Sequence, residues 1–287
     1  MEERFNLAVR ISWWSVAGNI FLSIIKIMTG FWAGSWAMLS DGFHSFSDLL
    51  STIGVLVGLH IARQPVDKTH PYGHGKAEAI TAKFIGILLV AVGVAVAAGA
   101  INRLFSPALA VPGFAALLVA LFSLLLKEVM FQYTFRAGKK TGSPALKADA
   151  WHHRSDAYSS LASLVGIAGA RLGVPLLDPL AGLAVAFCIV HMGFKILKDS
   201  IDSLMDAALD ESIIQELKEF ASQVEGVEEV RMVKARSYCS YLLVEMSIAV
   251  APELSIKEAH DISELVKDAI LDQNKDILEV FVHVDPA

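Results

Sequence analysis

The sequence predicts an α-helical membrane protein with six transmembrane helices over residues 1–204 and a cytoplasmic α+β domain over residues 205–287. Composition is the first observation behind this prediction. Of the 287 residues, 54% are hydrophobic and only 19% are charged, whereas average globular domains carry roughly 25% charged residues. The second observation is the uneven distribution of charge. Residues 1–204 carry 17 basic and 12 acidic side chains, whereas residues 205–287 carry 7 basic and 18 acidic side chains. Neither part has the strong basic field that nucleic-acid binding requires.

Six apolar segments are each long enough to cross a bilayer, for which about 20 residues of helix are needed. Residues 84–101 form an uninterrupted apolar run and residues 104–126 contain no charge. With their flanks, these two spans are expected over about 77–102 and 112–135. The other four expected spans are 9–30, with Lys26 near its end, and 36–62, 146–172 and 179–198.

Lysine and arginine in the short connections predict the orientation of the spans. If the N-terminus lies inside, the outer connections carry only Arg103 and Arg171, and the other basic flanking residues lie inside. Both termini are therefore expected in the cytoplasm. The Met-Glu-Glu start is followed by an apolar run without a small-residue cleavage site, which argues against a removable signal peptide.

The C-terminal part shows the periodicities of a small soluble domain. Helices are expected over 210–224 and 255–271, the second opened by a capping box of Ser255 and Glu258. Strands are expected over 227–235, 241–250 and 277–285, and apolar residues alternate cleanly in the second of them. The resulting α-β-β-α-β order is typical of a small α+β domain.

Two polar pairs lie inside predicted spans, where ionisable groups are costly and point to function. His44 and Asp48 are four residues apart, as are His152 and Asp156, so each pair occupies one helix face. At about 1.5 Å per residue, the first pair lies roughly 12–18 Å from the outer surface and the second roughly 9–15 Å from the inner one. All four side chains thus reach the membrane midplane, and two nitrogens with two carboxylates suit a four-coordinate zinc ion. The alternative is a set of interhelical hydrogen bonds, but two matched pairs favour metal.

Other polar residues of the spans are expected to play lesser parts. Asp41 shares a face with His44 and is expected behind the ligands or as a proton carrier. His153 points elsewhere on its helix. His60 and His191 have no partner at a suitable spacing and are interpreted as packing between helices.

Two further metal sites are predicted outside the spans. Asp67, His70 and His74 place three donors within eight residues of a loop at the cytoplasmic surface, although loop histidines are often only solvated. In the tail, the polar groups that could form a cytoplasmic site are Glu245, His260, His283 and Asp285; the alternative is an ordinary polar sheet face. Cys188 and Cys239 form neither a disulfide framework nor a Cys-x-x-Cys motif.

Three stretches resemble motifs of the cation diffusion facilitator family of divalent-metal/proton antiporters. They are Ser-Asp-Gly-x-His-x-x-x-Asp from residue 40, His-Pro-Tyr-Gly-His-Gly-Lys-Ala-Glu from residue 70 and Ala-Trp-His-His-Arg-Ser-Asp-Ala from residue 150. The resemblance covers essentially the whole chain. It implies a homodimer with a metallochaperone-like (ferredoxin-like) tail, a transport site at the two midplane pairs, a loop site and regulatory metal in the tail. Arg231 and Ser247 stand where some members have histidines, so a two-metal tail site is not implied.

The predicted function is therefore efflux of divalent transition metals, above all Zn²⁺, in exchange for protons, without a prosthetic group and without enzymatic activity. Metal and protons compete because ligands bind metal only when deprotonated. Fe²⁺, Mn²⁺, Co²⁺ or Cd²⁺ are alternative substrates, and a metal-binding membrane scaffold or sensor is an alternative function. An intramembrane metallohydrolase is disfavoured, because the sequence has no His-Glu-x-x-His motif. The expected location is the inner or plasma membrane of a prokaryote.

Overall fold

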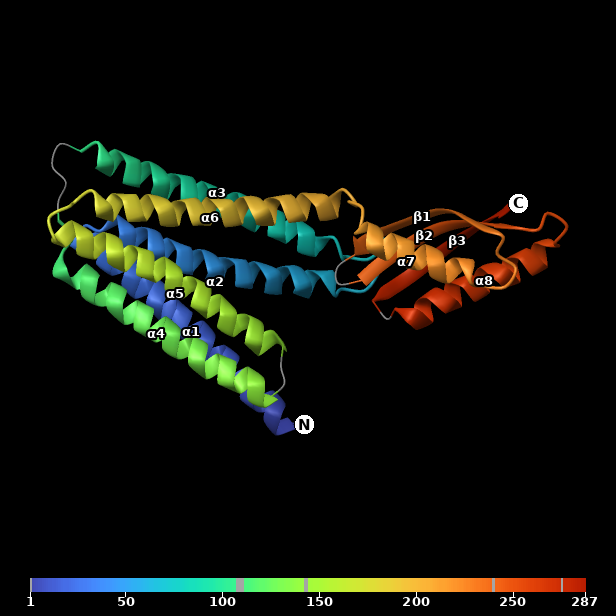
Figure 1. Cartoon of the computed structure of the whole chain (residues 1–287), viewed down its shortest axis with the longest axis horizontal. Helices are drawn as coiled ribbons and strands as arrows, with labels where there is room; N and C mark the ends of the chain where they lie inside the picture. Colours follow the sequence, from blue (N-terminus) through green and yellow to red (C-terminus); the bar gives the residue numbers. More distant parts are fainter. Residues whose placement is uncertain (1, 107–110, 142–143, 239–240, 275) are drawn as a thin grey trace. The chain divides into compact units, whose positions relative to one another are not determined.

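The computed structural model describes residues 2–106, 111–141, 144–238, 241–274 and 276–287 (Figure 1). They form two compact units. The first unit comprises the chain up to Gly54 and Phe84–Leu197, and the second unit comprises Val55–Lys83 and Lys198–Ala287. Cys239 lies outside the described residues.

Six long helices form where the sequence predicts membrane spans. They are α1 (Glu2–Ala33), α2 (Trp36–Ala62), α3 (Ala77–Leu104), α4 (Phe114–Thr141), α5 (Pro144–Arg171) and α6 (Leu177–Leu204). By length and composition, α1, α2, α3, α4 and α6 each contain a segment able to cross a membrane. Helix α5 is not in this group, because charged residues such as Lys147, Asp149, Arg154 and Asp156 fall in its first half. A sixth span therefore stays a prediction.

Helix α2, which carries one of the two polar pairs, is held in the first unit by its neighbours. At its N-terminus, the Trp36 N–H donates to Asp178 Oδ2 over 2.8 Å and the Ser35 hydroxyl donates to Asp178 Oδ1 over 2.5 Å. At Gly42, α2 approaches α1 so closely that a Cβ atom would lie 2.9 Å from the backbone nitrogen of Ile27. Glycine at such contacts lets two membrane helices touch along their backbones.

The second unit contains the small α+β domain. Its elements are α7 (Glu211–Ser222), β1 (Glu229–Tyr238), β2 (Tyr241–Val250), α8 (Ile256–Gln273) and β3 (Ile277–Pro286), in the predicted α-β-β-α-β order. Strand β2 is central, antiparallel to β1 and parallel to β3. The predicted capping box is present, since Ser255 N donates to Glu258 Oε2 over 2.8 Å and Glu258 N donates to Ser255 Oγ over 3.3 Å. The two helices and the sheet share one hydrophobic core, built around Leu217, Val244, Met246, Val266 and Ile270.

Candidate metal centres

The two polar pairs of the first unit meet. One ligand atom each of His44, Asp48 and Asp156 lies within 4.8 Å of the other two. His152 borders this group, with its Nε2 3.9 Å from Asp48 Oδ2 and 3.8 Å from Asp156 Oδ2. We call these four residues the midplane quartet. Two residues of α2 and two of α5 thus supply two imidazoles and two carboxylates, with His152, 46% exposed, at the edge of the group.

Two atoms of the midplane quartet are buried without a hydrogen-bond partner among the described residues, namely His44 Nδ1 and Asp48 Oδ2. A buried polar atom without a partner is destabilising and rare, so each such atom calls for an explanation. A cation bound between the quartet residues would supply the missing interaction. The donor set therefore fits a divalent metal as a transported substrate.

Asp156 differs from Asp48 because a lysine already contacts it. Lys127 of α4 places its Nζ 2.5 Å from Asp156 Oδ2 and donates to Asn19 Oδ1 of α1 over 2.7 Å. Its side chain is only 1% exposed. Lys127 was not predicted as part of the site, although the adjacent charges of Lys127 and Glu128 within the apolar span 112–135 were a signal that could have found it.

Asp41 forms a polar network with Lys26 and two serines of α5. Its Oδ2 lies 2.8 Å from Lys26 Nζ, and both side chains are fully buried. The hydroxyls of Ser159 and Ser160 donate to Asp41 Oδ1 and Oδ2 over 2.7 and 2.9 Å. Asp41 therefore has three donors on its two oxygens and lies outside the group formed by His44, Asp48 and Asp156. Its role behind the ligands or as a proton carrier stays a prediction.

The remaining histidines of the helices lie away from the midplane quartet. His153 is buried on another face of α5, and its Nε2 lies 2.6 Å from Ser15 Oγ and 3.5 Å from Asp149 Oδ2. His60 and His191 are both exposed. His191 stacks on Phe187 of its own helix, with ring centroids 6.3 Å apart. The interpretation of His60 and His191 as packing between helices is therefore wrong for the single chain, because an exposed ring fills no interhelical space.

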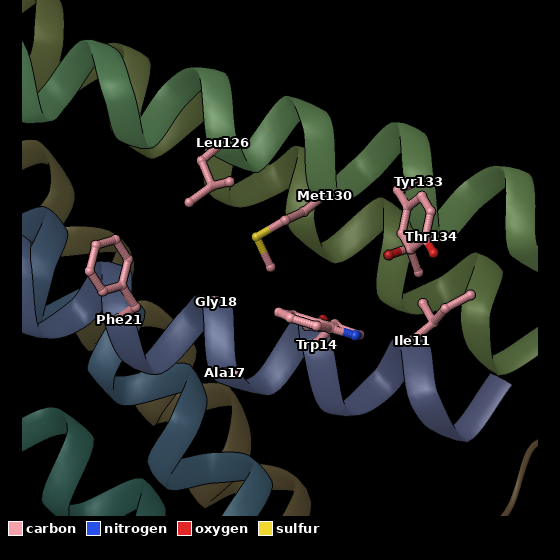
Figure 2. A pocket seen from close by; sticks show the side chains of 10 residues that line it. Ile11, Trp14, Ala17, Gly18, Phe21, Leu126, Met130, Tyr133 and Thr134 are labelled. Carbon is pink, nitrogen blue, oxygen red and sulfur yellow. The ribbon is translucent and has the colours of Figure 1, made fainter. Parts of the chain in front are cut away.

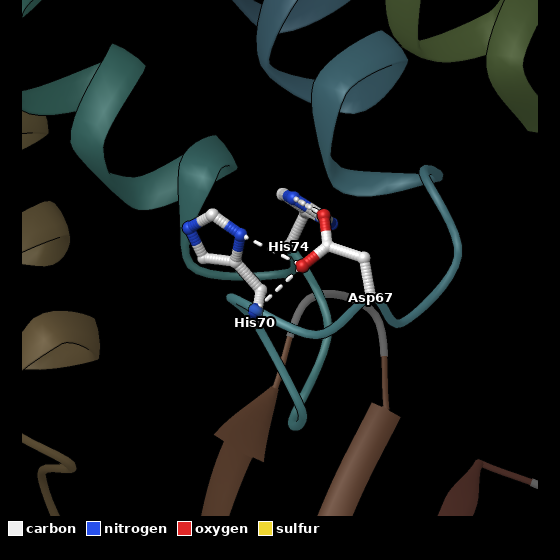
Figure 3. Close-up of side chains that lie close together, drawn as sticks. All are labelled: Asp67, His70 and His74. Atoms are coloured by element: carbon white, nitrogen blue, oxygen red, sulfur yellow. Dashed lines mark hydrogen bonds and ion pairs between the residues drawn. The ribbon is translucent and has the colours of Figure 1, made fainter.

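The loop between α2 and α3 brings its three predicted donors together in the second unit (Figure 3). Ligand atoms of Asp67, His70 and His74 lie within 4.8 Å of one another, and the two imidazole centroids are 4.3 Å apart. Asp67 Oδ1 accepts hydrogen bonds from the hydroxyl and N–H of Thr69 and from the N–H of His70 over 2.7, 2.8 and 2.6 Å. These hydrogen bonds, first that of the Thr69 hydroxyl, hold the pKa of Asp67 well below its usual range. The carboxylate is therefore ionised and ready to bind a cation at neutral pH.

The tail residues come together only in part. His283 Nε2 lies 3.2 Å from Asp285 Oδ1, and His260 and Asp285 line the same cavity of about 350 Å³. The Ser247 hydroxyl donates to Asp285 Oδ2 over 2.5 Å. This bond first, and then the nearby His283, lower the pKa of Asp285.

Glu245 does not belong to this group, which corrects the predicted set of four. In the sheet, Glu245 of β2 pairs with Phe281 of β3, whereas Asp285 pairs with Ala249. At about 3.3 Å per residue, four residues along a strand separate the two carboxylates by roughly 13 Å. Glu245 lies instead 3.9 Å from Arg236 Nη2.

An apolar cavity of about 520 Å³ lies between α1 and α4 in the first unit (Figure 2). Trp14, Phe21, Leu126, Met130 and Tyr133 are among its lining residues. None of the lining residues is charged. The cavity therefore offers no ligand set for a cation.

Long apolar helices able to cross a membrane define an integral membrane protein, and a largely buried cluster of histidine and aspartate side chains among them is the arrangement expected of transporters. The family model of the cation efflux transmembrane domain matches residues 12–205, and that of the cation efflux protein cytoplasmic domain matches residues 209–287. The chain belongs to the cation diffusion facilitator family, which confirms the resemblance inferred from the motifs. Because the members of this family are transporters, the prediction that the chain is not an enzyme is confirmed as well.

Individual relatives cover most of the chain. It is 39% identical to metal tolerance protein C1 of Arabidopsis thaliana over 95% of this chain, and spans 61% of the length of that relative. It is 33% identical to the manganese efflux system protein MneP of Bacillus subtilis, over 99% of this chain and 98% of that one. The cadmium form of a single-residue variant of the MamM C-terminal domain is 30% identical, covering 27% of this chain and 96% of that chain with a TM-score of 0.26.

Proposed function

We propose that this protein exports divalent transition-metal ions from the cytoplasm in exchange for protons, with Zn²⁺ as the main substrate. The observation that carries the proposal is the midplane quartet, in which His44 Nδ1 and Asp48 Oδ2 are buried without a hydrogen-bond partner among the described residues. A metal-binding scaffold without transport would have no need for such a group deep inside the helices, where burial of polar atoms is destabilising.

The four donors of the midplane quartet favour Zn²⁺ among the divalent cations. Two imidazole nitrogens and two carboxylate oxygens suit a tetrahedral zinc ion, whereas Mn²⁺ prefers oxygen ligands. Mn²⁺ is the second candidate, because the relative MneP, matched over nearly its full length, is a manganese efflux system protein by name.

Proton exchange follows from the same ligands. Imidazoles and carboxylates bind metal only in their deprotonated forms, so protons and metal compete for one site. Histidine has an ordinary pKa of about 6.5, close enough to cytoplasmic pH for exchange. If the site opens alternately to the two sides, an inward proton gradient drives metal outward.

The rest of the chain is assigned supporting parts in this proposal. The loop residues Asp67, His70 and His74 bind a second metal ion, and the tail binds metal as a modulator through His260, His283 and Asp285. Residues 1–204 form the transport domain and residues 205–287 a regulatory and dimerisation domain, in a homodimer with both termini in the cytoplasm of a prokaryote. The match of the tail to the cytoplasmic-domain model supports this division.

Metal uptake by inside-out proteoliposomes tests the proposal. The full-length protein is reconstituted with an acidic interior, and uptake of Zn²⁺, Mn²⁺, Fe²⁺, Co²⁺ and Cd²⁺ is measured with the accompanying loss of the pH gradient. We expect Zn²⁺ uptake by the wild type and none by Asp48→Asn. The matched control is Glu128→Gln, which removes a carboxylate of α4 that contacts Gln132 and not the midplane quartet. If the wild type moves no divalent cation, the transport proposal is wrong and the metal-binding scaffold is the remaining function.

A further inference from the structure

We infer that Lys127 is a built-in counter-cation of the transport site, which an incoming metal ion has to displace from Asp156. The inference rests on the proposed function, because it assigns a role to a residue beside the proposed ligands. It makes Lys127 a positioning residue that sets how tightly metal binds and how readily it leaves.

The lysine and the metal would compete for the same carboxylate. Lys127 Nζ contacts Asp156 Oδ2, and that oxygen is the one 3.8 Å from His152 Nε2. Asp156 also supplies a ligand atom to the group formed with His44 and Asp48. A dication held by this group would therefore lie beside the ammonium of Lys127, and the two cations would repel each other.

Lys127 has a second hydrogen-bond partner that can hold its ammonium group when Asp156 binds a metal ion. Asn19 Oδ1 accepts a hydrogen bond from Lys127 Nζ over 2.7 Å. Because this carbonyl oxygen comes from α1 and Asp156 from α5, the ammonium is held between two helices. A small movement of the flexible lysine chain can give up the carboxylate and keep the amide.

The contacts of the other buried lysine, Lys26, are with groups outside the midplane quartet. Lys26 is committed to Asp41, and its remaining hydrogen bonds go to Ser45 and Ser160 over 3.2 and 2.8 Å. Among the described residues, Lys127 is thus the buried lysine whose charge faces a quartet ligand.

Charge arithmetic then shows what Lys127 does. With neutral imidazoles, Asp48 and Asp156 give the quartet a charge of −2, and the positive charge of Lys127 brings the total to −1. A bound dication raises the total to +1 with the lysine and to zero without it. The lysine therefore stabilises the empty site, which would otherwise hold two uncompensated buried carboxylates, and weakens the metal-loaded one. Both effects favour release of the metal ion and return of the empty site over tight retention of the metal.

Three variants of the full-length protein test the inference. Lys127→Gln keeps a hydrogen-bond donor and removes the charge, so we expect the Zn²⁺ dissociation constant and KM to fall about tenfold, with a lower kcat. Lys127→Arg keeps the charge and can hold Asp156 through two N–H groups, so we expect the dissociation constant to rise. The control is Lys139→Gln, which removes an exposed charge near Phe135 on the same helix.

Zn²⁺ affinity is measured by competition with a chelator on protein in nanodiscs, and KM and kcat by uptake in vesicles. A Lys127→Gln variant with wild-type affinity and turnover, or with weaker affinity, would overturn the inference. If this variant does not fold, Lys127→Arg decides alone, because an unchanged or lower dissociation constant contradicts the competition. Wild type and Asp48→Asn are measured in parallel. Absence of transport by the wild type rejects the proposed function, whereas normal transport with indifferent Lys127 variants rejects only the role of Lys127.

Discussion

Tyr238, the last residue of β1, donates a hydrogen bond to the backbone oxygen of Tyr72 over 2.5 Å. The same hydroxyl accepts the N–H of Gly75 over 3.1 Å. One phenol of the α+β domain thus fixes the loop at two points between His70 and the start of α3. Within the second unit, the geometry of the Asp67, His70 and His74 group depends on a residue far from it in the sequence.

Tyr238→Phe is therefore expected to weaken metal binding at the loop. The substitution removes both hydrogen bonds, a net loss of about 1 kcal/mol or about fivefold in affinity. Zn²⁺ binding is measured by calorimetry in a background of Asp48→Asn and His283→Ala, in which the midplane quartet and the tail site are both incomplete. Tyr241→Phe, at an exposed tyrosine of β2, is the control and should bind as its parent does. Equal affinity in both variants would mean that the loop holds its shape without Tyr238.

His44→Asp is expected to shift metal selectivity toward Mn²⁺. The change replaces a nitrogen donor of the midplane quartet with a hard oxygen donor, which should lower the Zn²⁺/Mn²⁺ transport ratio by a factor on the order of ten. Competition between the two ions in vesicle uptake measures the ratio. An unchanged ratio would place selectivity in the shape of the site or in groups around it.

The separation of Glu245 from Asp285 makes a distinct prediction for the tail. His260→Ala combined with His283→Ala should abolish metal binding by the tail, while Glu245→Gln should leave it unchanged. Both are measured by calorimetry on full-length protein carrying Asp48→Asn and Asp67→Asn, so that the other two sites are impaired. Transport by the double histidine variant in an otherwise wild-type chain should persist, with activation shifted to higher metal concentration. A loss of tail binding in Glu245→Gln would require the tail to be arranged differently from the single chain described here.

The low pKa of Asp67 gives a prediction with a definite sign. Because folding lowers this pKa, the ionised carboxylate stabilises the loop turn above the unfolded-state value, and the stabilisation disappears as the pH falls through the folded-state value. Hydrogen exchange at the N–H groups of Thr69 and His70 should therefore stay slow at pH 5 in the metal-free protein. In Asp67→Asn, whose amide oxygen is a weaker acceptor than a carboxylate, the same groups should exchange faster at this pH. Similar protection in both proteins would mean that other contacts hold the turn.

The sequence predicted those features that depend on local periodicity. Helix spacing predicted that His44 and Asp48 share one helix face, as do His152 and Asp156. The calculated depth predicted that both pairs lie near the membrane midplane. The two pairs then meet if α2 and α5 are neighbours. The network around Lys127 and Asn19 was not predictable in this way, because it depends on which faces of three helices meet. The alternation of apolar and polar residues in β2 predicted the sheet face of Glu245. It did not predict how far Glu245 lies from Asp285 along the sheet, because that distance depends on the pairing of β2 with β3.

The contact at Gly42 has a mechanical consequence. With no Cβ between Gly42 and the backbone of Ile27, and with Lys26 bonded to Asp41 one residue away on each side, α1 and α2 are locked at this level by both shape and charge. We therefore expect these two segments to move together when the helices rearrange. Relative movement is then expected where this pair contacts the other helices, and His44 and Asp48 would move with α2.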